Sequence, residues 1–168
     1  HIGNRNIEDA NIPLRIISTN VATGQKVVFK KGDIAQAVMA SSAIPGIFHP
    51  VEFNKQMLVD GGIVENVPIN TAKAMGANYV IGVDLNAKHE YGRPRHILDV
   101  VLNSFHYTLM AAAKLQTEDA DLLIAPNLSG FNRSDMSQVG KLMEQGYKDA
   151  QKALGKLGPL PKSKYQPA

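Results

Sequence analysis

The sequence contains no cysteine among its 168 residues, and it has no long apolar run. Without cysteine, disulfide bonds, thiolate metal sites and cysteine nucleophiles are excluded, and the composition is compatible with the cytoplasm. No apolar stretch approaches the roughly 20 residues that a helix needs to cross a bilayer, and the first residues show no apolar leader pattern. We expect a cytoplasmic protein whose contact with membranes, where it occurs, is peripheral.

The sequence also lacks a large excess of charge of either sign. The chain has 18 lysine and arginine residues against 15 aspartate and glutamate residues, a formal net charge of +3. Nucleic-acid binding needs a basic stripe with interleaved aromatic side chains, and the five phenylalanines and five tyrosines mostly stand apart from the scattered lysines. We therefore expect a solvated basic face and no nucleic-acid partner. The same charges suit an anionic lipid surface.

The residues that are present have the balance of one globular domain, with 44% hydrophobic and 20% charged side chains. In the first half, Asp33 predicts the cap of a helix over 34–42. Turn residues between short apolar runs predict two hairpins, 13–19 with 25–29 and 51–53 with 57–59. We expect residues 1–154 to form the domain and 155–168, with three prolines and three lysines, to be a flexible tail.

In the second half, helices and strands alternate, which is typical of the α/β class. Helices are predicted from Pro68 to Met75, over 95–116 and over 135–154, and strands over 79–83 and 122–125. Because 79–83 is apolar on both faces, we expect it to be buried and parallel. The predicted apolar faces of the two long helices comprise Ile97, Val101, Phe105, Thr108, Ala112 and Leu115, and then Met136, Val139, Leu142, Met143, Tyr147, Ala150 and Leu154.

The densest candidate for chemistry is Asp60, which follows the second hairpin and precedes Gly61 and Gly62. The ends of strands are where α/β sheets collect their ligands, and glycine permits backbone conformations and close approaches that side chains forbid. An aspartate placed there can act as a base. It can equally accept hydrogen bonds from the turn that it begins, as aspartates in turns usually do.

Four motifs in order link this aspartate to a known family. They are Pro13-Leu-Arg-Ile-Ile-Ser-Thr-Asn-Val-Ala-Thr-Gly24, Ala37-Val-Met-Ala-Ser-Ser-Ala-Ile-Pro-Gly-Ile-Phe48, Val59-Asp-Gly-Gly62 and Gly76-Ala-Asn-Tyr-Val-Ile-Gly-Val-Asp84. The stretch from Pro13 to Asn86 resembles the C-terminal half of the patatin-like phospholipase family, in its bacterial branch. It departs from many relatives at Met39, where they have arginine, and at Asn20, where they have aspartate.

The resemblance implies a three-layer α/β sandwich, of which this chain is the C-terminal part, and a lipid acyl hydrolase with a Ser-Asp dyad. Asp60 matches the dyad aspartate, and Gly61 and Gly62 complete its motif. The serine and its glycine-rich oxyanion loop lie N-terminal to these motifs in the family, and neither occurs here. We expect His1 to mark where that half is missing, the missing half to be the partner of this one, and the chain alone to be inactive. No metal or cofactor is implied.

The other polar candidates are weaker. Ser41 and Ser42 lie on a predicted helix, and Ser129 lacks the glycines of a nucleophile elbow. His49 precedes Asp60, against the order of an α/β-hydrolase triad, so a packed turn histidine is expected. An Asp60/Asp84 pair remains open for a metal ion or for acid-base work.

The remaining histidines show no metal-ligand spacing; they are His89, His96 and His106. A second hypothesis accounts for the absence of a nucleophile. The chain is then a non-catalytic α/β partner, or a module that binds a lipid without cleaving it.

Overall fold

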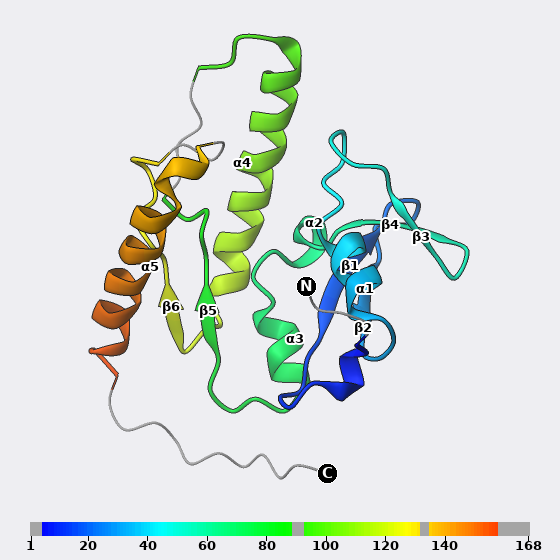
Figure 1. Ribbon diagram of the computed structural model, residues 1–168, viewed down its shortest axis with the longest axis horizontal. Helices are drawn as coiled ribbons and strands as arrows, with labels where there is room; N and C mark the ends of the chain where they lie inside the picture. Colours follow the sequence, from blue (N-terminus) through cyan, green and yellow to red (C-terminus); the bar gives the residue numbers. More distant parts are fainter. Residues whose placement is uncertain (1–4, 89–92, 132–134, 158–168) are drawn as a thin grey trace. The chain divides into compact units, whose positions relative to one another are not determined.

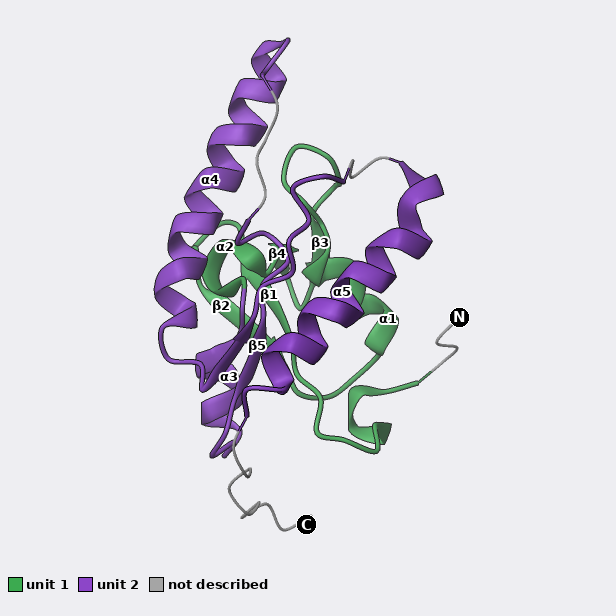
Figure 2. Cartoon of the chain, turned by 90° about the vertical axis from the view of Figure 1, so that its left-hand side faces the viewer, with its two compact units in different colours: residues 1–66 green, residues 67–168 purple. Residues whose placement is uncertain are grey.

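Two compact units, residues 1–66 and 67–168, divide the chain (Figure 2). The computed structural model describes residues 5–88, 93–131 and 135–157 (Figure 1). Most of the predicted tail, residues 158–168, lies outside the described residues, as does His89. Both units combine helices with a sheet, so the predicted α/β class is confirmed.

The first unit is built on a four-stranded antiparallel sheet. Its strand order is β2 (Lys26–Phe29), β1 (Ile16–Asn20), β4 (Gln56–Asp60) and β3 (Val51–Phe53). Both predicted hairpins are confirmed, β1 with β2 and β3 with β4. The sheet joins them through the central pair β1–β4, and this pairing places Asp60 beside the middle of β1.

Helix α1 (Ile34–Ser41) packs on β1 and β4 of this sheet (Figure 1). Asp33 caps it as predicted, since its side chain accepts a hydrogen bond from the Gln36 N–H at 2.9 Å. Ala37 and Ala40 are completely buried, and their small side chains let the helix lie close to the strands. The core of this unit comprises Ile7, Phe29, Ala37, Ala40 and Leu58.

A four-residue helix, α2 (Gly62–Glu65), begins immediately after β4 and was not predicted. Its last residue, Glu65, is buried and forms an ion pair with Lys26 of β2, with 2.8 Å between Nζ and Oε2. Because α2 also contacts β1, it fixes the direction in which the chain leaves Asp60.

The second unit follows the predicted alternation. It comprises α3 (Ile69–Ala74), β5 (Ile81–Val83), α4 (Ile97–Thr117), β6 (Leu122–Ile124), a 3₁₀ turn (Met136–Gln138) and α5 (Val139–Leu154). Strands β5 and β6 pair in parallel, as expected, and α5 packs on β6. The buried cluster of this unit contains Val67, Ile69, Val80 and Ala113.

The predicted burial of strand 79–83 on both faces is wrong. Gly82 is buried, and a Cβ there would lie 2.9 Å from Ile69 Cδ1. Its neighbours Ile81 and Val83 are 42% and 53% exposed. Apolar sequence shows that a strand prefers burial, but burial itself needs a covering element, and the described residues supply one on a single face.

The apolar faces of the long helices are also largely exposed. On α4 the buried residues are Ala113 and Thr117, whereas Ile97 and Leu115 face solvent. On α5 no residue is fully buried, and Met143 and Tyr147 are 71% and 65% exposed. Periodicity identifies residues that share a face, but not whether another element packs there. Within the described ranges, no helix combines the length and apolarity needed to cross a membrane.

Candidate active site around Asp60

The backbone of Asp60 is held by two other segments of the first unit. Its N–H donates to the carbonyl oxygen of Ala43, just after α1, at 3.0 Å. Its carbonyl oxygen accepts a hydrogen bond from Thr19 Oγ1 on β1 at 2.9 Å. Both backbone polar groups of Asp60 are therefore satisfied, and its Cα–Cβ bond has a fixed starting direction.

The carboxylate of Asp60 is partly buried and is fixed through one oxygen. Oδ1 accepts a hydrogen bond from the Gly62 N–H at 2.7 Å, which is the turn interaction that the sequence suggested. Oδ2 accepts no hydrogen bond from the part of the chain that the structure describes. The turn role and the base role are therefore compatible, because one oxygen orients the group and the other has free lone pairs.

Gly61 and Gly62 are required because neighbouring atoms lie too close for a side chain, and not because their backbone angles are unusual. Gly61 has φ −70° and ψ −19°, an ordinary helical conformation, and neither glycine is among the residues with positive φ. The expectation that they supply conformations forbidden to other residues is wrong. A Cβ at Gly61 would lie 2.1 Å from the carbonyl oxygen of Ile17, and one at Gly62 would lie 3.0 Å from Asp60 Oδ1.

Sequence reasoning missed the residue that lies opposite Asp60. In the β1–β4 pair Ser18 is its direct partner, and Ser18 is 0% exposed. Its Oγ is buried and makes no hydrogen bond with any residue that the structure describes. No pattern in the sequence signals this serine, because its importance depends on the register between strands that are 40 residues apart.

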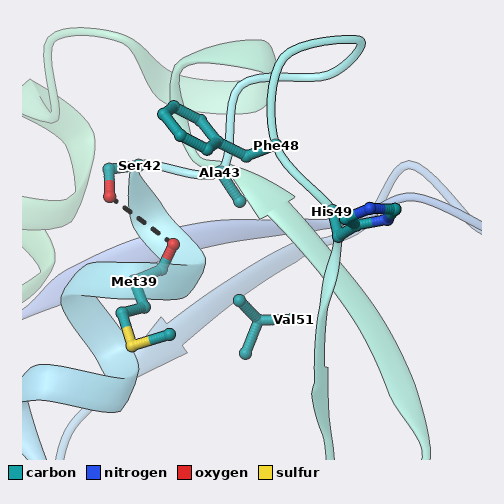
Figure 3. Close-up of a pocket in the computed structure, with 6 residues that line it drawn as sticks. All are labelled: Met39, Ser42, Ala43, Phe48, His49 and Val51. Carbon is teal, nitrogen blue, oxygen red and sulfur yellow. Dashed lines mark hydrogen bonds between the residues drawn. The ribbon is translucent and has the colours of Figure 1, made fainter.

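An apolar hollow of about 270 Å³ lies in the same unit (Figure 3). It is lined by Met39, Ser42, Ala43, Phe48, His49 and Val51. Ala43 links the hollow to the site, since its carbonyl oxygen holds the Asp60 N–H. The Phe48 side chain is 59% exposed, so this wall of the hollow presents apolar surface to solvent. We call these six residues the apolar hollow.

The hollow contains a serine and a histidine, but they form no catalytic pair. Ser42 Oγ donates to the carbonyl oxygen of Val38, at 2.8 Å, and more weakly to that of Met39 (Figure 3). No hydrogen bond joins Ser42 to His49, both of which the structure describes. The hydroxyl of Ser42 is therefore used by its own helix, as is common for serine near a helix end.

Asp84, the other strand-end aspartate, belongs to the second unit. Its Oδ1 accepts the Asn86 N–H at 2.9 Å, the same turn interaction that Asp60 makes with Gly62. Among the described residues, no group of three His, Asp or Glu side chains is placed to hold a metal ion.

The remaining candidates are engaged locally in the second unit. Ser129 Oγ donates to Asn127 Oδ1 at 2.8 Å, and His106 Nδ1 lies 2.8 Å from the carbonyl oxygen of Leu102. The N–H groups of Arg95 and His96 lower the pKa of the exposed Asp99 carboxyl at the start of α4. These contacts shape turns and helix ends within the second unit.

Comparison with known proteins decides the relationship of the first unit. Residues 1–73, which include Ser18, Asp60, Gly61 and Gly62, match the family described as "Patatin-like phospholipase". This part of the chain is similar to the patatin-like phospholipases. The matched region contains the whole first unit. Asp60 and its hydrogen-bond partners therefore lie within the residues that match the family.

Individual relatives extend the similarity. An uncharacterized NTE family protein of Mycobacterium bovis is 31% identical over 157 residues, covering 83% of this chain and 27% of that protein. A second such protein, from Mycobacterium tuberculosis, is 36% identical over 80 residues, 48% of this chain and 22% of the relative. The lysophospholipase NTE1 of Candida albicans is 33% identical over 81 residues, 48% of this chain and 6% of its own length. The chain thus spans about a quarter or less of these curated relatives.

Proposed function

We propose that this chain is the Asp-bearing part of a patatin-like lipid acyl hydrolase. Asp60 is the base of a Ser-Asp dyad, and the nucleophilic serine comes from sequence outside these 168 residues. The observation that carries the proposal is the state of the Asp60 carboxylate, whose Oδ1 is fixed by Gly62 while Oδ2 is open. The patatin-like match over residues 1–73 and the lysophospholipases among the relatives support it.

In the proposed reaction Asp60 accepts a proton from the serine and later returns it to the leaving group. As the serine oxygen attacks the acyl carbonyl, its O–H bond breaks and the proton moves to Asp60 Oδ2. The C–O bond to the leaving alcohol then breaks, and that alcohol takes the proton from Asp60. Water repeats the sequence on the acyl-serine, which releases the fatty acid and restores both groups.

In this proposal the acyl chain of the substrate binds in the apolar hollow. Four of its six lining residues, Met39, Ala43, Phe48 and Val51, are apolar, and Ala43 is hydrogen-bonded to Asp60. A flexible methionine beside an aromatic ring adapts to chains of different shape. Ile47 and Phe48 are both more than half exposed, and this apolar surface suits a peripheral contact with lipid. We therefore propose a cytoplasmic enzyme that works at membrane surfaces.

In this proposal residues 1–154 are the C-terminal half of a three-layer sandwich, and the partner is the N-terminal half of the same domain. Parallel sheets are normally covered on both faces and contain more than two strands. Strand β5 pairs only with β6 among the described strands, and its Ile81 and Val83 are exposed. A further strand and a covering helix from the remaining half would bury both residues.

The test is Asp60→Asn in the intact protein. The substitution keeps an oxygen for the Gly62 N–H and removes the base, so ester hydrolysis should disappear while the fold is retained. The matched control is Asp84→Asn, because Asp84 makes the same turn at the end of β5. Activity should survive in this control, whereas a metal site shared by the two aspartates predicts its loss in both variants.

A fluorophosphonate probe tests the location of the nucleophile. It should label a serine outside residues 1–168, and labelling of any serine within them, such as Ser41, Ser42 or Ser129, would contradict the proposal. Absence of both labelling and turnover in the intact protein would favour a lipid-binding module without a nucleophile.

A further inference from the structure

Ser18 carries a polar atom that the fold leaves without a partner. The residue is 0% exposed, and within the described ranges its Oγ makes no hydrogen bond. Buried hydroxyl groups are nearly always hydrogen-bonded, because desolvation without a partner is unfavourable. An exception in the centre of a sheet therefore calls for a specific reason.

The sheet register identifies the groups that can reach this hydroxyl. Ser18 lies directly opposite Val27 on β2 and Asp60 on β4. Directly opposite residues of antiparallel strands point to the same face, with Cβ atoms about 4.5–5.5 Å apart. Val27 has no polar side-chain atom, so Asp60 is the cross-strand neighbour with an available acceptor.

Burial excludes an external partner. Because Ser18 is completely enclosed within the chain as described, neither bulk solvent nor a docking polypeptide reaches Oγ without displacing residues that cover it. The free Oδ2 of Asp60 is, in contrast, on the same face of the sheet and also lacks a hydrogen bond from the described residues.

We propose that Ser18 is a positioning residue for Asp60, and its catalytic consequence rests on the proposed function. Rotation about the Ser18 Cα–Cβ bond brings the hydroxyl toward Oδ2, where it donates a hydrogen bond to the charged carboxylate. With Oδ1 held by Gly62 and Oδ2 by Ser18, the carboxylate plane is fixed. The second lone pair of Oδ2 stays available for the serine proton.

The decisive variant is Ser18→Ala in the intact protein. It removes one oxygen atom and leaves the apolar packing almost unchanged, so the melting temperature should fall by no more than the loss of one hydrogen bond requires, as in the control below. We expect kcat to fall about tenfold, the effect of one hydrogen bond of about 1.4 kcal/mol, with KM unchanged because Ser18 does not touch substrate. The control is Thr117→Val, which removes a buried hydroxyl that is bonded to the Lys114 carbonyl oxygen. This control should lower the melting temperature and leave kcat unchanged.

A spectroscopic readout separates this inference from the proposed function. In a carbon-13 spectrum of the side-chain carboxyl groups, the Asp60 Cγ resonance should move in Ser18→Ala and stay in place in Thr117→Val. An unmoved Asp60 resonance overturns the inference whether or not the protein hydrolyses esters. A wild-type kcat in Ser18→Ala, in a protein that Asp60→Asn inactivates, overturns its catalytic part and leaves the dyad intact.

Discussion

Replacing Gly61 with alanine tests whether close approach at the end of β4 is essential. The new Cβ would lie 2.1 Å from the carbonyl oxygen and 2.6 Å from the carbonyl carbon of Ile17. Both are backbone atoms of a central strand, so no rotamer change relieves the contact. The chain can accept alanine only if β1 and the segment after Asp60 move apart.

The expected cost follows from the kind of atoms involved. Overpacking against side chains typically costs about 1–3 kcal/mol, because side chains shift part of the way. A backbone contact at this distance belongs at or above the upper end, and we expect the free energy of unfolding to fall by about 3 kcal/mol or more. This is a large fraction of the roughly 5–15 kcal/mol that stabilises a typical domain.

Urea denaturation followed by far-UV circular dichroism measures this loss, with two alanine variants for comparison. Gly146 lies inside α5, and a Cβ there would meet no atom within 4 Å beyond the backbone of its own helix, so Gly146→Ala should gain about 0.5–1 kcal/mol from helix propensity. In Gly62→Ala the atoms nearest to the new Cβ belong to the side chains of Asp60 and Asn66, whose oxygens would lie 3.0 Å away, so this variant should cost less than Gly61→Ala. A Gly61→Ala protein within about 1 kcal/mol of the wild type would refute the reasoning.

Two further predictions concern charged groups. Lys26→Met removes the 2.8 Å ion pair to Glu65, whose side chain is only 5% exposed, and should lower the free energy of unfolding by about 2 kcal/mol. Lys30 is exposed, so Lys30→Met should change the free energy of unfolding by less than about 0.5 kcal/mol in the same urea titration. Hydrogen bonds from the Gln145 side chain and the Asn127 N–H hold the pKa of Asp149 below its ordinary value of 3.8. The stability that the Asp149 carboxylate contributes is therefore complete above pH 3.8 and is lost as the pH falls below that value. The Asn127 amide should accordingly stay protected from hydrogen exchange at mildly acidic pH and lose protection only in stronger acid. Loss of protection above pH 3.8 would contradict this.

Local signals made much of the first unit predictable from the sequence. The turns around Gly24 and Asn54 separate apolar runs, and both hairpins follow from them. Asp33 caps α1 by a hydrogen bond three residues along the chain, an interaction that sequence spacing directly encodes. The position of Asp60 at a strand end follows from the same hairpin.

Features that depend on distant residues were not predictable. Helix α2 begins with Gly62, a poor helix former. Its buried Glu65 forms an ion pair with Lys26 on β2, which lies far away in the sequence. The role of Gly61 depends on the backbone of Ile17 and not on its own φ. The isolation of Ser18 Oγ becomes visible only when the β1–β4 register is known.

The anchoring of Asp60 has a consequence for how this site changes during evolution. Of its three hydrogen-bond partners, Ala43 contributes a main-chain oxygen and Gly62 a main-chain N–H, and Thr19 alone contributes a side chain. Main-chain groups survive almost any substitution that preserves the path of the chain. Substitutions at position 43 that preserve the path of the chain can therefore leave Asp60 in the same orientation.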